Sequence, residues 1–122
     1  MTKKILVVDD SIFLQSLLKD RLESEGFFVI QALDGKEGLE KVKNENPDLV
    51  LLDVKMPIMD GFECCRRIKN DPIIKHIPVV FLTVMSQKTD IESGIEAGAE
   101  AYFTKPYDGN ALVSKIKELL KI

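Results

Sequence analysis

The chain has 122 residues, of which 45% are hydrophobic and 30% are charged. This is the composition of one folded domain, and it excludes both a disordered tail and a multidomain enzyme. The 17 basic and 20 acidic residues give a net charge of −3, the wrong sign for a domain whose main task is to grip a phosphate backbone. We therefore expect no direct nucleic-acid binding.

Short apolar runs alternate with segments of helical spacing along the whole chain, which predicts a strand followed by a helix, five times over. The predicted strands are Ile5–Val8, Phe27–Ala32, Leu49–Leu52, Val79–Thr83 and Ala101–Thr104. The predicted helices are one after Ser11, then Gly35–Asn46, Gly61–Asn70, Thr89–Ala97 and Leu112–Leu120. Strands joined by helical crossovers are parallel, so we expect a doubly wound α/β domain with helices on both faces of the sheet.

Apolar spacing predicts which helix faces pack inward. In the first helix, the apolar face is predicted from Leu14, Leu17, Leu18 and Leu22. In the third helix, the inward residues are predicted to be Phe62, Cys65 and Ile68. The adjacent cysteines, Cys64 and Cys65, point in different directions and are expected to be reduced thiols, at least one of them packed.

The N-terminal segment carries no export or membrane signal. Its apolar run, Ile5–Val8, is only four residues long and ends in two acids, unlike a signal peptide or a membrane span. We expect a cytoplasmic protein with no membrane insertion. The only histidine, His76, lies in a loop between prolines and is expected to be an exposed residue rather than a phosphate carrier.

Polar residues gather at the predicted strand ends, where ligands of doubly wound sheets bind. Asp9 and Asp10 follow the first strand, Asp53 follows the third, Thr83 ends the fourth and Lys105 follows the fifth. If the first and third strands are neighbours, the three carboxylates converge and repel one another unless a cation compensates. Oxygen ligands without His or Cys favour Mg²⁺. Taken alone, the acidic pair would also fit a helix cap.

This set supplies what phosphoryl transfer to a carboxylate needs. Asp53 would be the nucleophile, and the metal and the ammonium of Lys105 would neutralise the phosphoryl oxygens. The hydroxyl of Thr83 would donate a further hydrogen bond.

At these positions the whole chain, residues 1–122, resembles the response-regulator receiver domains of two-component signalling, in particular the single-domain chemotaxis type. The matching motifs are Val8-Asp9-Asp10-Ser11, Leu52-Asp53-Val54-Lys55-Met56-Pro57, Met59-Asp60-Gly61, Thr83 and Lys105-Pro106. The resemblance implies a flavodoxin-like (βα)5 fold in three layers, with a five-stranded parallel sheet in the order 2-1-3-4-5.

The resemblance also implies a phosphoacceptor switch. Asp53 would accept a phosphoryl group from a phosphohistidine on a sensor histidine kinase or a histidine phosphotransfer protein. Mg²⁺, or Mn²⁺ in its place, would be held by Asp10, Asp53 and the backbone carbonyl of Lys55, with Asp9 acting through water. The chain would be no enzyme beyond its own phosphorylation and dephosphorylation.

The switch implied by the family turns the Thr83 hydroxyl inward, and Tyr102 follows it. The surface of the fourth helix, fifth strand and fifth helix is thereby remodelled for a downstream protein, with the chain a monomer or a weak phosphorylation-dependent dimer. The family also implies a cis peptide bond before Pro106. Without the resemblance, Tyr102 is simply a half-buried strand residue.

Several alternatives stay open on the residues alone. A phosphatase with an Asp nucleophile would need a second acid two residues later, where Lys55 stands. A nucleotide or flavin binder would need a phosphate-binding loop after the first strand, where the sequence is acidic. A receiver-like module that is never phosphorylated is the third alternative.

Val84 is larger than the usual family residue and would crowd the phosphoryl pocket. The chain is either a stand-alone regulator or part of a longer protein.

Overall fold

The computed structural model describes residues 2–122 and contains five strands and five helices in strict alternation. The strands are β1 (Lys4–Val8), β2 (Phe28–Ala32), β3 (Leu49–Leu52), β4 (Val79–Thr83) and β5 (Ala101–Thr104). The helices are α1 (Ile12–Ser24), α2 (Gly35–Glu45), α3 (Gly61–Lys69), α4 (Lys88–Glu96) and α5 (Gly109–Leu120). The predicted elements are confirmed, and their ends agree with the prediction to within three residues.

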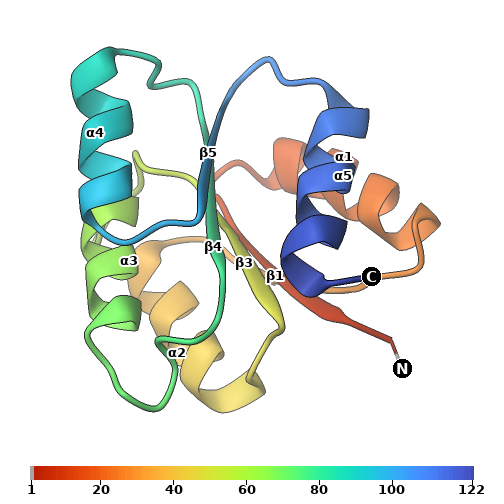
Figure 1. The fold of residues 1–122 in the computed structure, drawn as a ribbon, viewed down its shortest axis with the longest axis horizontal. Coiled ribbons are helices and arrows are strands. Elements are labelled where there is room, and N and C mark those ends of the chain that lie inside the picture. Colours follow the sequence, from red (N-terminus) through yellow and green to blue (C-terminus); the bar gives the residue numbers. More distant parts are fainter. Residues whose placement is uncertain (1) are drawn as a thin grey trace.

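The five strands form one parallel sheet in the order β2-β1-β3-β4-β5. Figure 1 shows α2, α3 and α4 on one side of the sheet and α1 and α5 on the other. The implied three-layer flavodoxin-like fold is therefore confirmed. The strand order reverses between β1 and β3, which places a crevice at the carboxyl ends of these two strands.

Both faces of the sheet are covered, which explains why the strands are continuous apolar runs. On β1, Ile5 and Val7 belong to the core beneath α1 and α5, whereas Leu6 and Val8 belong to the core beneath α2, α3 and α4. All four are at most 2% exposed. The strands are thus fixed from both sides, so the residues at their carboxyl ends are held in place.

Helix starts are fixed by side-chain caps next to the strand ends. The side chains of Ser11, Asp34, Asp60 and Asp108 each accept a backbone N–H of the helix that follows. These caps satisfy amides that would otherwise have no partner and orient each helix relative to the preceding loop. Within residues 2–122, no helix is both long and apolar enough to cross a membrane.

The prediction for the buried face of α1 was wrong in part. Leu14 and Leu17 are 41% and 54% exposed, whereas Gln15 is 2% exposed and packs with Leu18 and Leu22 against the sheet. The helix is therefore rotated so that an amide takes the place expected for a leucine. Two hydrogen bonds from the Gln15 amide to backbone carbonyls hold the helix in this orientation.

The packing predictions for α3 hold for Cys65 and Ile68 and only in part for Phe62. Cys64 and Cys65 are both buried and both free thiols, and Ile68 is fully buried beside them. Phe62 is only partly buried, although its ring packs on that of Phe81. His76 is exposed, as expected for a loop residue.

Candidate functional site

Three carboxylates meet at the crevice between β1 and β3. Val8 and Leu52 are register partners, and the amide of Asp53 donates to the carbonyl of Val8 at 2.9 Å, so the two chain segments leave the sheet side by side. One carboxylate oxygen from each of Asp9, Asp10 and Asp53 lies within 4.8 Å of the others. Asp9 is buried and Asp10 exposed, so the cluster opens on one side to solvent.

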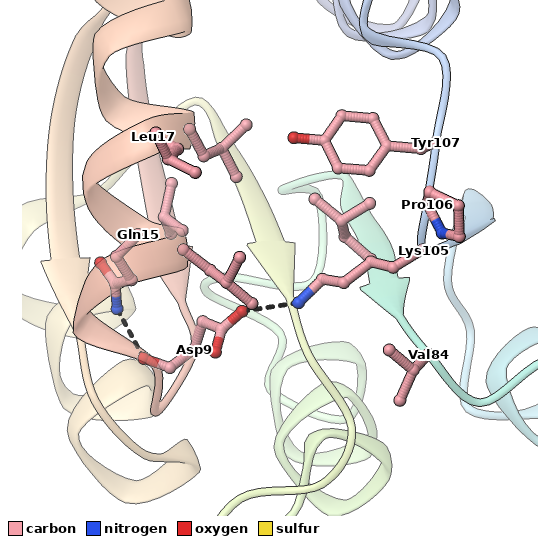
Figure 2. A pocket seen from close by; sticks show the side chains of 11 residues that line it. Asp9, Gln15, Leu17, Val84, Lys105, Pro106 and Tyr107 are labelled. Carbon is pink, nitrogen blue, oxygen red and sulfur yellow. Dashed lines mark hydrogen bonds and ion pairs between the residues drawn. The ribbon is translucent and has the colours of Figure 1, made fainter.

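Lys105 brings a cation to this cluster from the loop after β5. Its Nζ lies 2.8 Å from Oδ2 of Asp9 and 3.5 Å from Oδ2 of Asp53, and Figure 2 shows its stem reaching across to Asp9. Burial alone favours the neutral amine, but the hydrogen bond to Asp9 and the charges of Asp53 and Asp9 outweigh it and raise the pKa of Lys105. The ammonium is therefore charged at neutral pH.

The donor chemistry of the cluster fits a hard divalent cation. The three carboxylates and the single ammonium leave two negative charges, which one Mg²⁺ cancels. All the side-chain donors are oxygens, the ligands that Mg²⁺ prefers to His or Cys. Asp10 and Asp53 would hold the ion directly, and Asp9, which is hydrogen-bonded to Lys105, would act on it through water. The part predicted for the carbonyl of Lys55 stays a prediction.

A glycine packs tightly against the backbone of Asp53. The amide of Gly61 donates to the carbonyl of Val54 at 2.8 Å, and a Cβ on Gly61 would lie 2.0 Å from the carbonyl oxygen of Asp53. The start of α3 is therefore in close contact with the segment that carries Asp53. The amide of Val54 in turn donates to Oδ1 of Asp53 at 2.7 Å, which orients the carboxylate.

Thr83 and Tyr102 are connected through Met85. Thr83 is fully buried at the end of β4, and its Oγ1 accepts the amide of Met85 at 3.3 Å. The hydroxyl of Tyr102 donates to the carbonyl of the same residue at 2.7 Å. Burial raises the pKa of Tyr102 to about 12, so this hydroxyl is a donor throughout the neutral range. The two residues predicted for the switch are thus linked by one backbone unit.

Sequence reasoning missed Gln15, which ties α1 to the acidic strand end. Its Nε2 donates to the carbonyl of Asp9 at 2.7 Å, drawn as a dashed line in Figure 2, and also to the carbonyl of Ala32. Asp9 directly follows β1 and Ala32 ends β2, so one side chain joins the ends of two strands to a helix. A polar residue at helical spacing from Leu18 and Leu22 was the available signal.

The exposed leucines of α1 line an apolar groove beside the cluster. The groove has a volume of about 470 Å³ and lies between α1 and the segment after β5. Its apolar walls come from Val7, Leu14, Leu17, Leu18, Leu82, Val84, Pro106 and Tyr107. Val84 lies at the rim of the groove and is 68% exposed. The peptide bond between Lys105 and Pro106 is cis, as the family implied.

Comparison with known proteins agrees with this geometry. The family model for the response regulator receiver domain matches residues 5–117. The chain belongs to the response-regulator receiver family. It is 41% identical over 121 residues to the response regulator PleD of Caulobacter vibrioides, covering 99% of this chain and 27% of that protein. It is 40% identical to the regulatory protein PhoP of Bacillus subtilis, covering 99% and 50%. The receiver domain thus spans half or less of these relatives.

Solved structures of other receiver domains share the fold throughout. The receiver domain of a histidine kinase from Syntrophus aciditrophicus has a TM-score of 0.92 at 37% identity, covering 98% of this chain and 91% of that one. A CheY-like receiver protein from Methanospirillum hungatei also has a TM-score of 0.92, at 34% identity, covering 99% and 95%. This receiver domain is therefore a module of two-component signalling.

Proposed function

We propose that this receiver domain is a phosphoacceptor switch in which Asp53 takes a phosphoryl group from a phosphohistidine. The single observation that carries the proposal is the placement of the Asp53 carboxylate, 3.5 Å from the ammonium of Lys105 and within 4.8 Å of the carboxylates of Asp9 and Asp10. The carboxyl ends of the strands then bring together a nucleophile, a cation and a pair of acids that can bind a metal.

In the proposed reaction, an oxygen of Asp53 attacks phosphorus, the P–N bond to the imidazole breaks, and the imidazole leaves and takes up a proton. Mg²⁺, with Mn²⁺ as an alternative, would neutralise charge on the phosphoryl oxygens. Lys105 would supply a second positive charge, because its ammonium already lies 3.5 Å from the Asp53 carboxylate. Thr83 would turn its hydroxyl from the amide of Met85 to a phosphoryl oxygen.

The donor in this proposal is a sensor histidine kinase or a histidine phosphotransfer protein in the cytoplasm. The readout is a downstream protein that binds the surface of α4, β5 and α5 and favours one state of it. The chain would be a monomer or a weak phosphorylation-dependent dimer. It would not turn over a substrate, because the only chemistry is phosphorylation of Asp53 and hydrolysis of the product.

The test uses acetyl phosphate and Mg²⁺ with intact-mass detection. The wild type is expected to gain one phosphoryl group and Asp53→Asn none, because the amide cannot act as the nucleophile. Asp20→Asn, which changes an exposed acid on α1, is the matched control and should be phosphorylated normally. Phosphorylation of Asp53→Asn would refute the site.

A receiver-like module that is never phosphorylated remains the competing function. If acetyl phosphate fails with the wild type, a phosphohistidine protein is the decisive donor, because Val84 at the groove rim can slow small donors. If neither donor phosphorylates the wild type, the module that is never phosphorylated is favoured. The acid, threonine and lysine set at one strand edge supports the switch instead.

A further inference from the structure

A glycine in α4 makes room for the ring of Tyr102. A Cβ on Gly94 would lie 2.7 Å from Cδ2 and 2.9 Å from Cε2 of Tyr102, closer than real Cβ contacts come. It would also lie 3.1 Å from Cδ2 of Phe81, a tight contact. The tyrosine ring therefore fills the space that any side chain at position 94 would need.

The backbone does not explain why a glycine stands here. Gly94 lies inside α4, where glycine lowers helix stability relative to alanine. Its φ is not among the positive values, unlike that of Gly98 at 102°, so the conformation suits any residue. Space for the Tyr102 ring is the remaining reason for the glycine.

Tyr102 is held by three contacts that lead from the site to α4. Its ring centroid lies 5.6 Å from that of Phe81, its edge lies over Gly94, and its hydroxyl donates to Met85 at 2.7 Å. Met85 donates in turn to the hydroxyl of buried Thr83. A rearrangement at Thr83 is thus transmitted to α4 through the backbone of Met85 and the ring of Tyr102, which contacts Gly94.

We propose that Gly94 is a positioning residue that seats the Tyr102 ring and thereby couples the conformation of this side chain to the position of α4. A side chain at position 94 displaces the ring, and the hydrogen bond from Tyr102 to Met85 breaks with it. The proposal goes beyond the proposed function, and it rests on that function only for the use of the coupling in signalling.

The first test is a double-mutant cycle on thermal unfolding. In an ordinary helix interior, Gly→Ala raises the melting temperature, whereas Gly94→Ala is expected to lower it because the methyl collides with Tyr102. In a Tyr102→Ala background the same substitution is expected to raise it or leave it unchanged. An increase in the wild type, or an equal decrease in both backgrounds, would overturn the proposal.

The second test follows the ring itself by fluorine NMR of protein labelled with 3-fluorotyrosine. The chain has two tyrosines, and Tyr107→Phe assigns their signals. Gly94→Ala is expected to shift the Tyr102 signal and leave that of Tyr107, which lies in the groove beside α1, in place. An unchanged Tyr102 signal in Gly94→Ala would refute the proposed contact between Gly94 and the ring. If Gly94→Ala does not fold, its recovery in the Tyr102→Ala background decides the matter.

Neither test needs Mg²⁺ or a phosphoryl donor. Failure of the cycle would therefore overturn the role of Gly94 and leave phosphorylation of Asp53 intact. Failure of Asp53 to become phosphorylated would remove the proposed function and leave the packing of Tyr102 on Gly94 standing.

Discussion

At the scale of single residues, the side chain that departs most from its usual place is Gln15. Its Oε1 has no hydrogen-bond partner among the described residues, yet its Nε2 satisfies two strand-end carbonyls. A buried acceptor without a partner is costly, and the two hydrogen bonds that Nε2 donates, one of them to a carbonyl of Asp9 that has no other donor within residues 2–122, offset that cost. Gln15 thus fixes the geometry of the strand ends next to the acidic pair.

Gln15→Leu is expected to destabilise the fold by about 1–3 kcal/mol, because the buried carbonyl of Asp9 loses its donor and that of Ala32 keeps only the amide of Asp9. Leu17→Gln, on the exposed face of the same helix, should change the free energy of unfolding by only about 0.5 kcal/mol. Urea unfolding measures both. A larger cost for Leu17→Gln than for Gln15→Leu would mean that the leucine face is the buried one.

At the scale of elements, the strands were predictable because both sides of the sheet are covered and each strand is a bounded apolar run. The rotation of α1 was not, because helical spacing alone fits Leu14 and Leu17 as well as Gln15. The choice depends on hydrogen bonds to carbonyls of two strands that the sequence does not place together. Similarly, the strand-end acids were predictable, whereas the connection from Tyr102 through Met85 depends on side-chain and backbone geometry.

Gly61→Ala is expected to destabilise the chain by about 1–3 kcal/mol, because the new methyl overlaps the carbonyl of Asp53 and overpacks a rigid backbone contact. Displacement of that segment should also weaken Mg²⁺ binding. Gly109→Ala is a matched control, since Gly109 likewise begins a helix after an aspartate cap. Its methyl would meet only the far end of the Arg21 side chain and no backbone atom. Chemical unfolding and Mg²⁺ titration report both effects, and equal effects of the two variants would contradict the contact.

The thiols of α3 should resist alkylation in the folded state. Burial raises the pKa of Cys64 and of Cys65 to about 12, so almost no thiolate forms near pH 8. Iodoacetamide should modify both residues only after denaturation, as mass spectrometry would reveal. Because the native thiol pKa lies above the unfolded value of about 8.5, stability should fall as the pH rises above that value. Rapid labelling of native protein would contradict this burial.

At the scale of the whole molecule, charge is distributed unevenly. The chain carries a net charge of −3, while the crevice between β1 and β3 concentrates three carboxylates around one lysine. Folding brings Asp53 to the adjacent pair Asp9 and Asp10, whereas the unfolded chain keeps Asp53 apart from them, so this repulsion opposes folding. A cation that binds only the folded arrangement therefore stabilises the entire domain.

Mg²⁺ is accordingly expected to raise the melting temperature of the wild type at constant ionic strength. At ten times the dissociation constant the gain is about 1.4 kcal/mol, which corresponds to roughly 5–6 °C for a domain of this size. Asp10→Asn should melt slightly higher than the wild type without Mg²⁺, because one repelling charge is gone, and should lose most of the response to Mg²⁺. Asp20→Asn should respond as the wild type does. Two results from differential scanning calorimetry would argue against the crevice as the metal site: a melting temperature that does not change across millimolar Mg²⁺, or a full response in Asp10→Asn.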